Sequence, residues 1–189
     1  PAIAVGDING DGFDDFFLGG ARGFEASIYT QFQNGSFQKI EQPVFLEDKK
    51  YEDVSALFLD ADRDGDMDLL VVSGGNEDIL TSSSHLLRLY LNRGQGNFYR
   101  ADTQVFPNIS ISAKALAACD YNHDGYVDIF VGGRVLPGHY GRRVENYLLK
   151  NSSKGFQIVG KINLSDYGWA TDATWVDMDG DGWEDLIIV

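Results

Sequence analysis

Short apolar runs alternate along the chain with polar loops that are rich in glycine and aspartate. Four runs stand before acidic loops, at 2–5, 55–59, 115–119 and 173–176, and four stand after them, at 16–20, 69–75, 129–133 and 186–189. The runs are rich in Val, Ile, Leu and Phe, and three of those after the loops end in a Gly–Gly pair. Runs of this length and composition are typical of β-strands and are too short for helices. Each acidic loop is therefore predicted to join two strands.

Three further segments, 26–40, 87–101 and 146–160, have the pattern of a second hairpin. In each, alternating residues lead into a turn of Asn, Gly or Ser, and a phenylalanine leads the return strand: Phe37, Phe98 or Phe156. Such turns between alternating apolar residues are a strong hairpin signal. Each repeat is therefore predicted to hold four antiparallel strands.

The four acidic loops mark an internal repeat. Their sequences are DINGDGFDD (7–15), DADRDGDMD (60–68), DYNHDGYVD (120–128) and DMDGDGWED (177–185). Their near-regular spacing divides the chain into approximate repeats at 1–53, 54–113 and 114–170 and an incomplete one at 171–189. Four-stranded units at such a period predict β-propeller blades around a central axis. The expected fold is all-β, a partial propeller over 1–189 with about three blades and the start of a fourth.

A β-sandwich of hairpins is the alternative architecture, but a sandwich would not need the same loop chemistry at the same place in every repeat. The chain begins at Pro1 without a methionine and stops directly after an apolar run, so both ends are interpreted as cuts. Propellers typically close with ~4–8 blades. We therefore expect the parent chain to supply further blades.

The net charge of −14, from 29 acidic and 15 basic residues, argues against a nucleic-acid partner. Phosphate binding needs clustered Lys and Arg, whereas a large share of the acidic residues here lies in the four loops. No run of 18 apolar residues exists, so no membrane span is expected. Cys119 is the only cysteine, and its small apolar neighbours predict a buried core residue rather than a nucleophile.

Each acidic loop follows the pattern D-x-[D/N]-x-D-G-x-x-D. In such a loop the side chains at positions one, three, five and nine and the carbonyl at seven offer oxygen atoms, and the glycine at six permits a sharp turn. The predicted ligands are Asp7, Asn9, Asp11, the Phe13 carbonyl and Asp15; Asp60, Asp62, Asp64, the Asp66 carbonyl and Asp68; Asp120, Asn122, Asp124, the Tyr126 carbonyl and Asp128; and Asp177, Asp179, Asp181, the Trp183 carbonyl and Asp185. Carboxylate-rich oxygen sets suit Ca²⁺ before Mg²⁺, which demands stricter octahedral geometry. We expect up to four structural Ca²⁺ ions.

The loops have two other possible interpretations. An EF-hand shares the first half of the loop but needs a bidentate Glu at position twelve. That position holds an apolar residue in all four loops: Leu18, Val71, Val131 or Ile188. The other alternative is a set of solvated acidic turns that bind no metal.

The loops and the hairpins together resemble the FG-GAP (VCBS-type) repeat family, whose best-known members form the propeller of integrin α-subunits. The resemblance spans essentially the whole chain and is nearer to bacterial multi-repeat members. It implies that the calcium positions carry over to the loop residues named above. It also implies a secreted or cell-surface protein that binds proteins or glycans, with a role in adhesion.

A ligand is expected on the face opposite the acidic loops, where the connections at 21–25, 76–85 and 134–145 vary most in length. The last of them carries a basic and aromatic cluster suited to an acidic glycan or a protein carboxylate: Arg134, His139, Tyr140, Arg142 and Arg143. A solvated loop that packs on a neighbouring blade is the alternative.

The chain has no HExxH, GxSxG or Walker motif, so a non-catalytic module is predicted. The alternative is part of a secreted propeller enzyme, of the polysaccharide lyase or glycosidase type, with its active site outside this segment.

Overall fold

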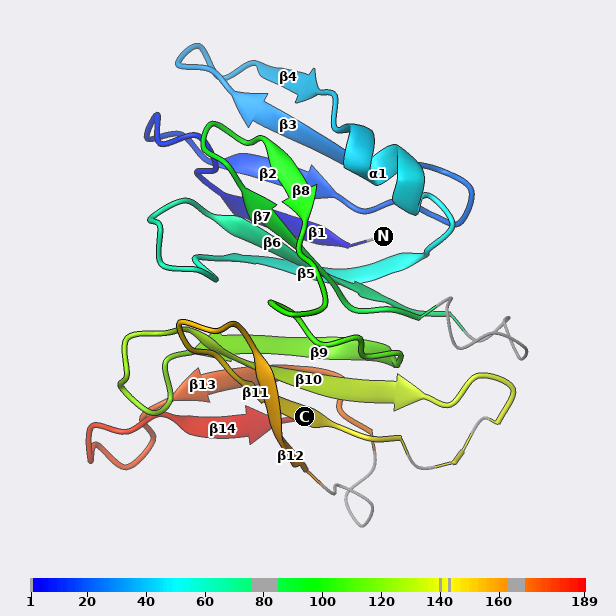
Figure 1. The fold of residues 1–189 in the computed structure, drawn as a ribbon, viewed down its shortest axis with the longest axis vertical. Helices are drawn as coiled ribbons and strands as arrows, with labels where there is room; N and C mark the ends of the chain where they lie inside the picture. The colour runs from blue at the N-terminus through cyan, green and yellow to red at the C-terminus, as the bar shows by residue number, and fades with distance from the viewer. Residues whose placement is uncertain (1, 76–84, 140, 143, 163–168) are drawn as a thin grey trace.

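The computed structural model describes residues 2–75, 85–139, 141–142, 144–162 and 169–189. It contains three four-stranded antiparallel sheets and a two-stranded fourth (Figure 1). The strands are β1 (Ile3–Gly6), β2 (Asp15–Leu18), β3 (Ser27–Gln31) and β4 (Phe37–Ile40); β5 (Asp53–Leu59), β6 (Asp68–Ser73), β7 (Arg88–Asn92) and β8 (Phe98–Arg100); β9 (Ser112–Cys119), β10 (Asp128–Val135), β11 (Tyr147–Lys150) and β12 (Gln157–Lys161); and β13 (Ala173–Val176) and β14 (Asp185–Ile188). Within each sheet the strands pair in chain order, as in a propeller blade. The predicted all-β fold of blade-like sheets is confirmed.

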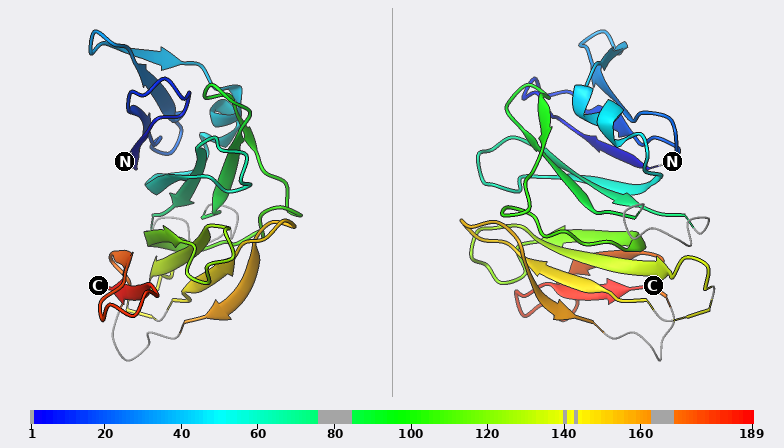
Figure 2. Two further views of the ribbon diagram at one scale, coloured as in Figure 1. Left: turned by 90° about the vertical axis from the view of Figure 1, so that its left-hand side faces the viewer. Right: turned by 45° about the vertical axis from the view of Figure 1, so that its right-hand side comes forward.

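The first strands of neighbouring blades lie beside one another. β5 contacts both β1 and β9, and β9 contacts β13. The left-hand view of Figure 2 shows these four strands along one side of the molecule. The sheets therefore share an inner edge, as blades around an axis do.

Burial differs between blades at the same place in the repeat. All six residues of β6 are buried, because blade two (β5–β8) is covered on both faces. Leu69 and Val71 pack with blade one (β1–β4), whereas Leu70 and Val72 pack with blade three (β9–β12), as the two-residue period of a strand requires. In β2 only one face is covered, so Phe17 is buried and Leu18 is exposed.

A short helix between blades one and two was not predicted from the sequence. α1 (Pro43–Asp48) begins with proline at its first turn, where the missing N–H costs nothing. Its buried Phe45 makes edge-to-face contacts with Phe17, at 5.6 Å between ring centroids, and with Tyr90, at 5.2 Å. The helix therefore closes the outer part of the contact between the two blades.

A buried polar network reinforces this contact. Arg88 donates a short hydrogen bond to Asp53, whose other carboxylate oxygen accepts the N–H of Gly20 in blade one at 2.8 Å. Arg88 also donates to the hydroxyl of Tyr90 at 3.0 Å, and that hydroxyl donates to Asp48 at 2.8 Å. The network joins β5, β7 and α1, and its ion pair is 3% and 4% exposed.

The phenylalanines predicted to lead the return strands stand where expected, since Phe37 and Phe98 begin β4 and β8 and Phe156 directly precedes β12. Phe98 and Phe156 are buried, whereas Phe37 is 48% exposed on the uncovered face of blade one. The prediction that Cys119 is a buried core residue holds only in part. Cys119 is only half-buried, at the end of β9. Burial and nearby carboxylates raise the pKa of its thiol, which disfavours the thiolate. Within the described ranges, no helix combines the length and apolar character of a membrane span.

Candidate metal centres

The four acidic loops lie at one end of the blades, each between a first and a second strand. Figure 1 shows them on the left of the molecule, on the same side as the turns that join the third and fourth strands. Each loop precedes a strand whose first residue is the position-nine aspartate: Asp15, Asp68, Asp128 or Asp185. The predicted ligands therefore belong to one repeated structural unit.

The position-one aspartate organises each loop by accepting backbone N–H groups. Asp7 accepts those of Gly10 and Gly12, both at 2.8 Å, and Asp177 accepts those of Gly180 at 2.8 Å and Gly182 at 2.9 Å. Burial raises the pKa of Asp7, but the loop N–H groups outweigh it and hold the pKa below its usual value. The carboxylate is thus fixed in its ionised form.

Backbone geometry explains the glycine at position six. That residue has φ between +86° and +92° in all four loops, a region that side chains disfavour. Position four also has positive φ, yet Arg63 and His123 occupy it in loops two (60–68) and three (120–128), at +65° and +55°. Only position six is glycine in every loop, in agreement with the sharp turn predicted there.

In loops one, two and three the position-nine aspartate is buried and joins the loop to the end of the third strand of its blade, whereas Asp185 of loop four is exposed. Asp68 is fully buried; one oxygen accepts the N–H of Ala61 at 2.8 Å and the other that of Asn92 at 2.7 Å. Asp15 repeats this arrangement with Ile8 and Gln31. Each carboxylate oxygen has a second lone pair, so these bonds leave room for a metal ligand. A structural role in the blade was not anticipated for this position.

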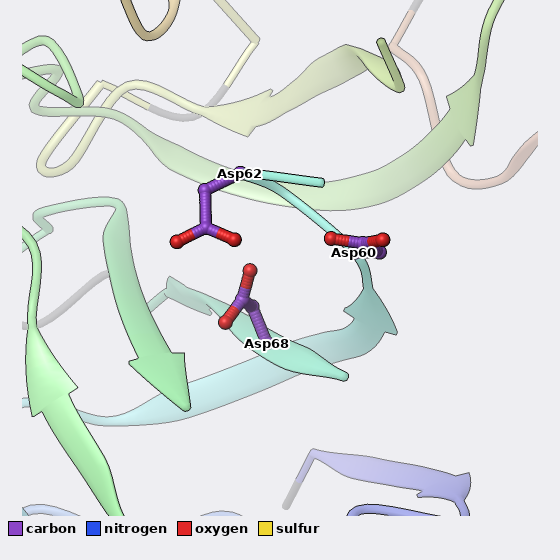
Figure 3. Close-up of side chains that lie close together, drawn as sticks. All are labelled: Asp60, Asp62 and Asp68. Carbon is purple, nitrogen blue, oxygen red and sulfur yellow. The ribbon is translucent and has the colours of Figure 1, made fainter. Parts of the chain in front are cut away.

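Two loops bring three carboxylates together. In loop two the groups of Asp60, Asp62 and Asp68 offer oxygens that lie within 4.8 Å of one another (Figure 3). Loop four (177–185) does the same with Asp177, Asp179 and Asp185. These are three of the five predicted ligand positions: one, three and nine. Position five is not in either group, and its carboxylate instead accepts the N–H of position seven, at 2.9 Å for Asp64 and 2.8 Å for Asp181.

Loops one (7–15) and three have asparagine at position three. Asn122 donates to Asp128 at 2.6 Å, and Asn9 donates to Asp11 at 3.0 Å. The position-five carboxylates Asp11 and Asp124 accept the N–H groups of Phe13 and Tyr126, at 2.9 and 3.0 Å. Position-seven residues thus lie in the same turn in all four loops.

Electrostatics in loop two favour a bound cation. Burial raises the pKa of Asp68 to about 7, although two backbone N–H groups oppose the change, and the charges of Asp62 and Asp64 raise it further. The pKa of Asp62 is raised by burial and then by Asp64. Carboxylates held this close repel one another, and a cation among them would relieve that repulsion. The all-oxygen donor set fits Ca²⁺.

Two buried asparagines connect neighbouring loops, and sequence reasoning missed them. Asn92 gives its backbone N–H to Asp68 in its own blade, while its side-chain amide donates to the Ile8 carbonyl of loop one at 2.8 Å. Asn151 does the same with Asp128 and with the Ala61 carbonyl of loop two, both at 2.7 Å. Both stand at the end of the third strand, β7 or β11, where the hairpin pattern predicts only a turn.

Further contacts run from position four of one loop to position seven of the next. The Arg63 guanidinium lies 4.7 Å from the ring centroid of Tyr126. The ring of His123 stacks on Trp183 at 4.5 Å, and its Nε2 lies 3.0 Å from the Glu184 carboxylate. Loops two, three and four therefore form a connected row.

The opposite face holds the predicted recognition residues, and only part of that cluster is described. Arg134 belongs to β10 rather than to the connection and is exposed. His139 and Arg142 lie in an exposed turn, in which Arg142 N–H donates to the His139 carbonyl at 3.0 Å. Tyr140, Arg143 and most of the connection at 76–85 lie outside the described residues.

Comparison with protein families finds the FG-GAP-like repeat in three copies, at residues 4–71, 75–131 and 136–188. The search of curated proteins gave no match. The three copies include all four acidic loops. They agree with the resemblance inferred from the loop and hairpin motifs.

Proposed function

Because the chain belongs to the FG-GAP-like repeat family, we propose that it is a non-catalytic, calcium-binding propeller module. It acts outside the cell, secreted or at the cell surface, where the face opposite the loops binds a protein or glycan. The observation that carries this proposal is the carboxylate group of Asp60, Asp62 and Asp68 around a fully buried position-nine residue. Its donors match the oxygen chemistry of Ca²⁺.

The calcium ions are proposed to be structural. In loop two, position nine already links the loop to the third strand, so an ion among positions one, three and nine would fasten the loop to the blade. A ligand that binds only the folded state stabilises it by mass action, by about 2.7 kcal/mol per site at 100 times Kd. Extracellular modules bind calcium with Kd of ~10⁻⁴–10⁻³ M, which suits a permanently occupied site.

Further blades are proposed to cover the apolar faces at the ends of this segment. Ile3 is 61% exposed and Val5 is 60% exposed, although both lie in the inner strand β1. Their counterparts in β5 and β9 lie between neighbouring blades. Exposed apolar side chains at inner-strand positions support a neighbouring blade of the same parent chain as the partner.

A thermal melt with millimolar calcium or with chelator tests the metal assignment, with two variants of loop two. Asp62→Asn weakens a ligand group, whereas Asp66→Asn removes the same charge from the same loop but keeps the position-seven carbonyl. Calcium should raise Tm strongly in the unsubstituted chain and in Asp66→Asn, and should raise it less in Asp62→Asn. Equal melts with and without calcium in a folded sample would refute the metal assignment and leave acidic turns.

A further inference from the structure

A cavity of about 370 Å³ lies at the opposite end of the blades from the acidic loops. Its wall comes from blade two, from blade three and from the segment that leads into β13. The lining includes Val54, Gly74, Ser112, Arg134, Trp169 and Thr171. Volumes of this size lie at the lower end of the range for small-ligand sites, about 300–1,000 Å³. The cavity therefore suits a ligand of one or two rings.

Arg134 supplies the only charged side chain among the described residues of the wall. It is exposed, and within the described ranges it makes no hydrogen bond or ion pair. Other arginines differ: Arg88 is paired with Asp53, and Arg100 donates to Asp48 at 2.9 Å. An exposed guanidinium beside a cavity offers a planar fork of donors to a carboxylate.

Two hydroxyl groups in the wall are fixed as acceptors for a ligand. The Ser112 side chain is 3% exposed, and its hydroxyl donates to the Gly75 carbonyl at 3.2 Å. The Thr171 hydroxyl donates to the Val189 carbonyl at 2.9 Å. Because each hydrogen is engaged, the oxygens remain available to accept hydrogen bonds from ligand hydroxyl groups.

Trp169 adds an apolar surface to this polar set. Its side chain is 38% exposed, and the indole Nε1 lies 3.5 Å from the Arg142 carbonyl, which it faces as a donor. Aromatic surfaces of this kind offer large contact area with a polar edge. A flat ring bearing hydroxyl groups on its rim and C–H groups on its face would match both the indole and the hydroxyl acceptors.

We propose that this cavity binds a carboxylate-bearing saccharide, a hexuronate unit, with its carboxylate on Arg134. The inference rests on the proposed function, since it gives a ligand class to the recognition face. An extended acidic peptide fits less well, because peptide recognition uses a groove or an open sheet edge. The net charge of −14 repels anions elsewhere on the chain, so binding depends on the charge of Arg134 and weakens with salt.

The test is a titration of the whole chain, in saturating calcium, with D-glucuronate or D-galacturonate. Binding is measured by ligand-observed NMR. We expect millimolar binding of a uronate, none of uncharged glucose, and a loss of about tenfold or more in Arg134→Gln. Arg134→Lys keeps the positive charge but lacks the planar pair of guanidinium donors, so its affinity for the uronate should lie between that of the unsubstituted chain and that of Arg134→Gln. Arg22→Gln is the matched control, since Arg22 is an exposed arginine in the connection at 21–25 of blade one, and it should bind as the parent does.

Three results would overturn the proposal: no uronate binding, equal binding to Arg134→Gln, or binding of a glutamate-rich peptide in place of a uronate. A melt of the same samples separates this failure from that of the proposed function. Calcium stabilisation without uronate binding rejects only the saccharide site. Absence of calcium stabilisation rejects the calcium module itself.

Discussion

The amide of Asn151 offers the sharpest test of how the blades are held together. Its side chain is fully buried, and Nδ2 donates at 2.7 Å to the Ala61 carbonyl at position two of loop two. Its Oδ1 accepts the N–H of Ser152 at 2.8 Å. Asn151→Ala removes both bonds but keeps the backbone N–H that donates to Asp128. The substitution therefore removes the bond between blades and one local bond to Ser152, and leaves the bond that ties Asn151 to Asp128 in place.

The expected cost follows from what the substitution leaves behind. A buried carbonyl that loses its donor costs about 1–3 kcal/mol, and the lost bond to Ser152 adds about 0.5–1.5 kcal/mol. The sum is a destabilisation of about 1.5–4.5 kcal/mol. In urea, with a slope of about 2 kcal/mol per molar, this lowers the midpoint of unfolding by about 1–2 M.

Asn34→Ala is the matched control. Asn34 lies in the exposed turn between β3 and β4, and its Oδ1 accepts only from Ser36, at 2.9 Å from the N–H and 2.7 Å from the hydroxyl. It should cost less than about 1 kcal/mol, because water replaces the lost bonds. Equal free energies of unfolding for Asn151→Ala and Asn34→Ala would refute the bond between blades as a source of stability.

Three further outcomes are expected. Asp53→Asn should lower the free energy of unfolding by about 3–5 kcal/mol in urea melts, since it leaves the buried Arg88 without its ionic partner; a loss near that of a surface substitution would contradict this. In chelator, burial raises the pKa of Asp68 to about 7, so the folded state binds a proton that the unfolded chain releases near pH 3.8. The stabilisation from this proton is fully present below pH 3.8 and is lost as the pH rises through 7. Tm in chelator should therefore fall between pH 5 and 8, and it should fall less in Asp68→Asn. A Tm that rises with pH over this range would contradict the expected direction of the pKa change. With calcium present, the ion competes with protons for the same oxygens, so the calcium-dependent gain in Tm should grow over that pH range.

The position and turn geometry of the acidic loops were predicted well because their information is local. Nine residues contain every predicted side-chain ligand, and the spacing alone places positions one and three in one turn. What the spacing does not reveal is how the oxygens are used. At position nine, backbone N–H groups and a metal ion can bind the same carboxylate. An aspartate at position 68 is therefore equally consistent with a metal ligand and with an acceptor for the N–H groups of Ala61 and Asn92.

Contacts between blades were missed for the opposite reason, since their partners are far apart in sequence. Asn92 reaches Ile8, 84 residues away, and Asn151 reaches Ala61, 90 residues away. No local pattern marks such pairs, and a turn explained both asparagines adequately. The helix α1 was missed because its six residues are too few for a helical period to show.

Comparison of β2 with β6 shows how the repeat combines the two kinds of information. Both strands begin with the buried position-nine aspartate and continue with apolar residues, so local pattern predicts the same strand twice. Their burial differs because blade two has a neighbour on each face and blade one has only blade two. The continuous apolar run of β6 is the mark of a strand covered on both sides. Because loops one and two lead directly into these strands, and Asn92 and Asn151 bond these two loops to the next blade, an ion bound in either loop would stabilise the packing of two blades and not of one.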